Sequence, residues 1–161
     1  MLVKTNAIVL RTIKYGDAKV IADLLTEHFG RLSFACNMPR TNKAKIKRQL
    51  FQPLTLLEIE FDHRPNIQLE RLRDARMPFP FASIPYNETK LAIALFVAEF
   101  LCYATRDEQQ NEPLYKYVET SVRWLDGAQQ AFANFHLAFM IRLSRFLGFF
   151  PNLENFSRGC L

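Results

Sequence analysis

The residues of this chain that could do chemistry form a basic stretch in its first third. Residues 39–48 read PRTNKAKIKR and contain five cations and no acid. So dense a run of cations repels itself and attracts polyanions such as the phosphates of a nucleic acid. A charge run is also commonly a solvated surface that binds nothing specific, and that alternative stays open for the individual lysines. The five cations are Arg40, Lys43, Lys45, Lys47 and Arg48.

Positive charge is concentrated in the same part of the chain. Residues 1–50 hold ten Lys and Arg against three Asp and Glu, whereas the remainder holds eleven against thirteen. The first part therefore carries a charge of +7 and the remainder −2, so the first part is the one for which a nucleic-acid partner is predicted. Arg11, Lys14 and Lys19 are further candidates for phosphate contacts, and Tyr15 is the best candidate to stack on a base.

No catalytic or metal-binding constellation is indicated. The three histidines and three cysteines are scattered, without the spacing of a metal site or a C-x-x-C pair. We therefore expect a protein that is not an enzyme and needs neither metal nor cofactor. The cysteine usage favours a reducing compartment, and no secretory signal or membrane-spanning run is present. We expect a cytoplasmic, nucleoid-associated protein without membrane contact.

The elements that must position the basic stretch are predicted to be strands. Five short runs with apolar alternation or β-branched residues fall within residues 1–77, separated by turn signals, and this pattern predicts a small barrel. Apolar residues on both faces of the first strand predict that part of the barrel's outside is covered. A break of phase between Leu69 and Leu72 predicts a bulge. The predicted strands are 3–13, 19–26, 31–36, 54–61 and 67–76.

The second half is predicted to be helical. Three prolines within residues 78–86 indicate a linker, and helices are predicted over 88–104, from Pro113 to Gly127, and over 129–147. The first of these is apolar almost all round, so we expect it to be buried between the others. The fold class is therefore α+β with two domains, a barrel over 1–77 and a helical bundle over 87–161.

Two arginines on the last predicted helix allow two interpretations. Arg142 and Arg145 lie about one turn apart, next to large apolar side chains. They are either surface arginines whose stems lie along the helix, or the cations of a pocket that binds a peptide carboxylate between apolar walls. The apolar members of that candidate pocket are Phe139, Leu143 and Phe146.

With these residues in view, the chain resembles the bacterial RecO family of DNA repair proteins. The resemblance implies an N-terminal OB-fold and a helical C-terminal domain. It implies binding to single- and double-stranded DNA, annealing of complementary strands, and joint action with RecR so that RecA is loaded in recombinational repair. It also implies binding to the C-terminal tail of single-stranded-DNA-binding protein. The similar segments are residues 7–11, 15–17, 24–32, 49–54, 99–101 and 146–153.

The sequence departs from the family pattern in two places. Some members carry a four-cysteine zinc site soon after the segment that matches residues 151–153, where this chain has only Cys160, so we expect no zinc. Members usually continue with more helical sequence, so we expect the helical domain to be incomplete. Two other functions stay open: a docking module in which the helices recognise the tail of single-stranded-DNA-binding protein, and an RNA-binding OB-fold protein.

Overall fold

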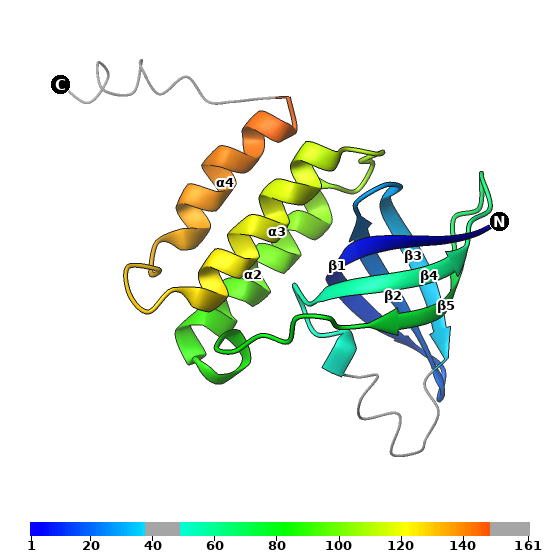
Figure 1. The fold of residues 1–161 in the computed structure, drawn as a ribbon, viewed down its shortest axis with the longest axis horizontal. Helices are drawn as coiled ribbons and strands as arrows, with labels where there is room; N and C mark the ends of the chain where they lie inside the picture. The colour runs from blue at the N-terminus through cyan, green and yellow to red at the C-terminus, as the bar shows by residue number, and fades with distance from the viewer. Residues whose placement is uncertain (38–48, 149–161) are drawn as a thin grey trace.

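The first half of the chain closes into a five-stranded barrel (Figure 1). The structure, a computed structural model, describes residues 1–37 and 49–148. Strands follow the order β1-β2-β3-β5-β4, and every neighbouring pair is antiparallel except β3 and β5, which are parallel. This is the OB-fold, and the predicted fold class is confirmed. The strands are β1 (Leu2–Tyr15), β2 (Lys19–Thr26), β3 (Gly30–Asn37), β4 (Leu56–Asp62) and β5 (Glu70–Arg76).

Strand β1 is buried on both faces, as its sequence predicted. Ala7 and Val9 lie inside the barrel, whereas Ile8 and Leu10 belong to the core that the barrel shares with the helices. Leu10 is the extra residue of a bulge, because Val9 pairs with Leu24 of β2 while Arg11 pairs with Asp23. The bulge bends β1, and the alternation of side chains along the strand directs Ile8 and Leu10 outward, against the helical half.

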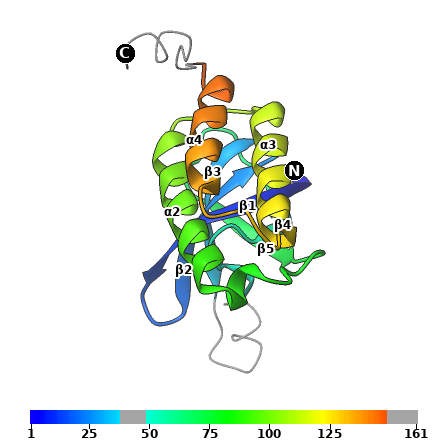
Figure 2. The same cartoon turned by 90° about the vertical axis from the view of Figure 1, so that its left-hand side faces the viewer.

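Three helices follow a short 3-10 turn, η1 (Ile84–Tyr86): α2 (Glu88–Ala104), α3 (Glu112–Gly127) and α4 (Phe135–Phe146). The Asn87 side chain accepts a hydrogen bond from the N–H of Lys90, and Asn111 caps α3 in the same way. These caps satisfy donors that the first turn of a helix leaves unpaired. Helix α4 packs on α2 and α3 on the side away from the barrel (Figure 2).

Two predictions about the helices were wrong in detail. The last helix begins at Phe135 and not near residue 129, because Ala131 adopts a left-handed backbone conformation, with φ of +61°, that interrupts helix formation. Helix α2 is not buried all round, since Leu95 and Phe96 are 49% and 46% exposed. Its inner face packs on β1, η1 and α4, whereas Leu91 and Tyr103 on this helix are exposed as well.

The predicted bulge in the last strand exists, slightly further along the chain. Glu60 of β4 pairs with Asp74 and Phe61 pairs with Leu72, so Arg73 is the extra residue. Strand β4 begins at Leu56, two residues later than predicted, because Leu54 has a φ of +65°. Leu54 is nevertheless fully buried, and its N–H donates to the carbonyl of Val9 at 2.7 Å.

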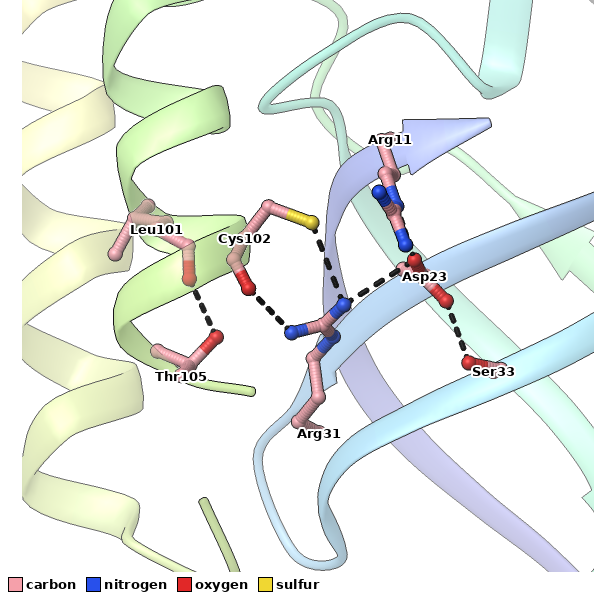
Figure 3. A network of polar contacts seen from close by, with 7 residues as sticks. All are labelled: Arg11, Asp23, Arg31, Ser33, Leu101, Cys102 and Thr105. Atoms are coloured by element: carbon pink, nitrogen blue, oxygen red, sulfur yellow. Dashed lines mark hydrogen bonds and ion pairs between the residues drawn. The ribbon is translucent and has the colours of Figure 1, made fainter. Parts of the chain in front are cut away.

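A buried polar network joins the barrel to helix α2 (Figure 3). The Asp23 carboxylate accepts hydrogen bonds from Arg11 Nε and Ser33 Oγ, both at 2.5 Å, and lies 3.2 Å from Arg31 Nη2. Arg31 Nη1 in turn donates to the carbonyl of Cys102 at 2.5 Å, in the last turn of α2. Burial alone would raise the Asp23 pKa, but the bonds from Ser33 and Arg11 and the Arg31 charge lower it below its usual value.

Candidate nucleic-acid interface

A row of exposed residues crosses the barrel where the β1–β2 hairpin turns. The strand registers place Tyr15 opposite Lys19, and Lys19 opposite Asn37 at the end of β3. Gly16 lets the hairpin turn with a φ of +73°. Tyr15 is 65% exposed, and Lys14, which precedes it, is exposed as well. The structure therefore brings together two of the predicted contact residues, Tyr15 and Lys19, and places Lys14 one position earlier on β1, opposite Val20.

Next to this row, the barrel opens into a groove between β3 and β5. The two strands pair at only two positions, Phe34 with Glu70 and Ala35 with Arg71. Beyond this short parallel seam lies a cavity of about 1020 Å³, with Asn37 and Lys19 at its edge. Leu50, which follows the segment 38–48, also lines it. Both ends of the segment that holds the basic stretch are therefore part of the groove wall.

Two arginines of β5 line this groove and were not predicted as contact residues. Arg71 and Arg73 are both exposed. Arg73 is the extra residue of the β5 bulge, and bulges are known to redirect side chains beside functional sites. Neither arginine forms an ion pair with a carboxylate within 4.0 Å in the described part of the chain. Both are thus placed to contact an anion in the groove.

The carboxylates of the groove weaken its positive charge only in part. Glu70 is 3% exposed, and its Oε1 accepts a hydrogen bond from the N–H of Arg64 and lies 3.1 Å from Nδ1 of His63. Its charge is therefore directed toward the turn before β5. The other lining carboxylate, Asp74, faces Glu60 across the β4–β5 pair and lines a second cavity as well.

The second cavity, of about 380 Å³, lies over β1, β4 and β5 and is lined by both cations and carboxylates. Lys4 lies 3.8 Å from Glu60, and Arg76 pairs with Glu58. Because its cations already have carboxylate partners, this cavity is a poor site for a polyanion. The groove between β3 and β5 is the better candidate.

Other predicted residues lie elsewhere or outside the described residues. Arg11 is on β1 at the junction with the helices, where its Nε donates to Asp23, and this bond is the main cause that raises the Arg11 pKa. It is separate from the row at the hairpin turn. The basic residues Arg40, Lys43, Lys45, Lys47 and Arg48 lie outside the described residues.

The candidate peptide pocket on α4 is divided between two faces of that helix. Phe139 and Leu143 are 2% and 0% exposed and belong to the helical core, where the Phe139 ring stacks on Tyr117. Phe146 is partly buried and also stacks on Tyr117. Arg142 and Arg145 are exposed, next to the exposed Ile141.

Residues 1–37 and 49–148 contain no group of three or more His, Cys, Asp or Glu side chains placed to hold a metal ion. Within the same residues, no helix has both the length and the apolar character needed to cross a membrane.

The strand order and the groove define an OB-fold protein with a helical C-terminal domain and a groove lined in part by cations. Comparison with known families extends this description. The family model described as "Recombination protein O N terminal" matches residues 1–81, and "Recombination protein O C terminal" matches residues 87–158. The chain belongs to the RecO family.

Relatives with the name DNA repair protein RecO are similar along the whole chain. The protein of Bacteroides fragilis is 52% identical over 159 residues, which is 99% of this chain and 66% of that protein. The protein of Phocaeicola vulgatus is 48% identical over 160 residues, with 99% and 66% covered. The protein of Flavobacterium psychrophilum is 37% identical over 156 residues, with 96% and 65% covered. The chain thus spans about 66% of the length of the two most similar of these relatives.

Proposed function

We propose that this chain binds single- and double-stranded DNA and anneals complementary strands in recombinational repair. The observation that carries the proposal is the groove between β3 and β5 of an OB-fold, which is lined by Lys19, Arg71 and Arg73 together with apolar side chains. OB-folds bind single-stranded nucleic acid with a basic groove and with aromatic side chains on which bases stack, and Tyr15 is exposed next to Lys19. Membership in a family whose relatives are named DNA repair proteins supports DNA over RNA as the ligand.

Annealing of this kind requires no bond chemistry. Two complementary strands repel each other through their phosphates, and a basic surface lowers that repulsion by neutralising part of the charge. Contacts to phosphate carry no sequence information, so the bases stay available for pairing. The basic stretch of residues 39–48 would add phosphate contacts. A protein that acts in this way is a mediator and not an enzyme.

The proposed partners are those of a recombination mediator. We propose that the chain acts with RecR to load RecA, and that the helical half binds the acidic tail of single-stranded-DNA-binding protein. Arg142 and Arg145, exposed beside Ile141, are the cations proposed to contact that tail. A tail peptide that binds the wild type and an Arg142→Glu/Arg145→Glu variant equally would contradict this assignment.

Charge reversal in the basic stretch tests the DNA-binding proposal. We expect the variant Lys43→Glu/Lys45→Glu/Lys47→Glu to bind oligonucleotides far more weakly and to anneal them poorly, because three phosphate contacts become repulsive. The measurement is fluorescence anisotropy, with far-UV circular dichroism to check the fold. A matched control, Lys4→Glu/Arg106→Glu/Lys116→Glu, makes the same change in net charge at exposed positions elsewhere. Equal affinity of the two variants would show that the basic stretch makes no specific contribution.

A further inference from the structure

We propose that the groove between β3 and β5 binds the bases of unpaired nucleotides, while Arg71 and Arg73 hold the adjoining phosphates. This inference rests on the proposed DNA-binding function and assigns it a specific site. The proposed site also distinguishes single-stranded from double-stranded DNA. A single strand would use the floor and the rim of the groove, whereas a duplex would use the cations alone.

The floor of the groove is apolar. Phe51 forms part of it and is 5% exposed, and Leu72 lies between the two arginines on β5. Leu69 stands just before β5 and is 44% exposed, so its side chain is accessible to a ligand in the groove. Apolar side chains of this kind can cover the face of a base, which has little affinity for water. The apolar lining residues are Ala35, Cys36, Leu50, Phe51, Leu69, Leu72 and Ala75.

The rim complements the other part of a nucleotide. Arg71 and Arg73 line the groove from β5, and Lys19 lines it from the start of β2. A guanidinium group can donate two parallel hydrogen bonds to a phosphate. The apolar and cationic side chains of the groove thus match a base and its phosphate in a single site. Tyr15 is exposed next to Lys19.

The size of the groove agrees with a short run of nucleotides. Its volume of about 1020 Å³ is at the upper end of the roughly 300–1,000 Å³ of small-molecule sites. A duplex keeps its bases paired and stacked inside the helix, so it cannot place them on the floor without first unpairing them. Duplex DNA therefore touches only the rim.

The test compares three fluorescent oligonucleotides of equal length: an ordinary single strand, a strand with abasic sites throughout its centre, and a duplex. We expect the variant Leu69→Ser to bind the ordinary strand about fivefold more weakly, and to bind the abasic strand and the duplex as the wild type does. Leu95→Ser is the matched control, because Leu95 is similarly exposed, at 49%, but lies on α2. It should leave all three affinities unchanged.

A cross-linking measurement on the wild type complements the variants. A single strand with 4-thiothymine at its centre should cross-link to peptides that contain residues 49–51 or 69–75. Cross-links confined to other peptides, or an equal effect of Leu69→Ser on all three oligonucleotides, would overturn the inference. In either case the proposed function would stand as long as the wild type binds DNA. Failure of the wild type to bind any of the three would overturn the proposed function itself.

Discussion

At the scale of single residues, Asp23 is a nearly buried carboxylate held between charged and polar side chains. Its side chain is 6% exposed and has two arginines and a serine hydroxyl as neighbours. The Arg31 side chain is 9% exposed, so the carboxylate is the counter-charge of a nearly buried cation. Removal of one partner from such a pair leaves the other charge uncompensated.

We therefore predict that Asp23→Asn lowers the free energy of unfolding at pH 7 by about 3 kcal/mol. Urea unfolding followed by circular dichroism measures this decrease. Asp107→Asn, at an exposed position of the α2–α3 connection, should change stability by less than about 0.5 kcal/mol. A similarly small decrease for Asp23→Asn would mean that the pair contributes little.

The same residue predicts a dependence on pH. The pKa of Asp23 is lowered in the folded state, so its stabilisation is complete above the unfolded pKa of about 3.9 and is lost as the pH falls through the folded value. The difference in stability between the wild type and Asp23→Asn should accordingly be constant above about pH 5 and shrink below about pH 4. A difference that stays unchanged down to about pH 2 would contradict the ionic origin of the effect.

The site residues differ in how far the sequence could predict them. Lys14, Tyr15 and Lys19 flank a turn signal, and such a turn exposes its neighbours. Arg71 and Arg73 were missed because nearby carboxylates cancel them when charge is summed along the chain, although their spacing of two residues places them on one face of a strand. The pairing of Arg11 with Asp23 depends on strand register, which composition does not reveal.

At the scale of elements, the predicted strands and helices were mostly confirmed because their signals are local. Alternation marks β4, and asparagine caps mark the starts of α2 and α3. The start of α4 was missed because it depends on the left-handed conformation of Ala131, a residue type that does not signal it. The exposed face of α2 was missed because an apolar pattern shows what a helix can bury, not which neighbours it has.

The turn between β2 and β3 is an element where barrel and helices approach each other closely. The N–H of Arg31 donates to the carbonyl of Glu108 at 3.0 Å, in the connection between α2 and α3. Gly30 beside it has a φ of +72°, and a Cβ there would lie 2.6 Å from the backbone carbon of Gln109. A Cβ built on Gly16, which has a φ of +73°, would meet no atom within 4 Å.

The two glycines allow a matched prediction. Gly16→Ala should lower the free energy of unfolding by about 1 kcal/mol, the cost of a left-handed alanine. Gly30→Ala should lower it by clearly more, because the backbone of residues 108–109 must also move and the hydrogen bond from Arg31 is strained or broken. Urea unfolding of both variants measures the difference. Equal decreases would contradict the close approach of barrel and helices.

At the scale of the whole molecule, barrel and helices are joined by one continuous core. Ile8, Leu10 and Leu25 of the barrel pack in the same cluster as Val97 and Leu101 of α2. The cationic groove lies on a different part of the barrel, between β3 and β5. The barrel can therefore present its groove to DNA while another part of its surface is held by the helices.

The most direct test of a DNA interface at this groove is a titration of single-stranded DNA at several salt concentrations, with the wild type and with Arg71→Gln/Arg73→Gln. We predict that the wild-type affinity falls with salt and that the variant binds more weakly. Its slope in a plot of log affinity against log salt should be shallower by about 0.7 for each phosphate that the variant no longer neutralises. Binding that does not depend on salt, or a variant with the wild-type affinity and slope, would contradict the interface.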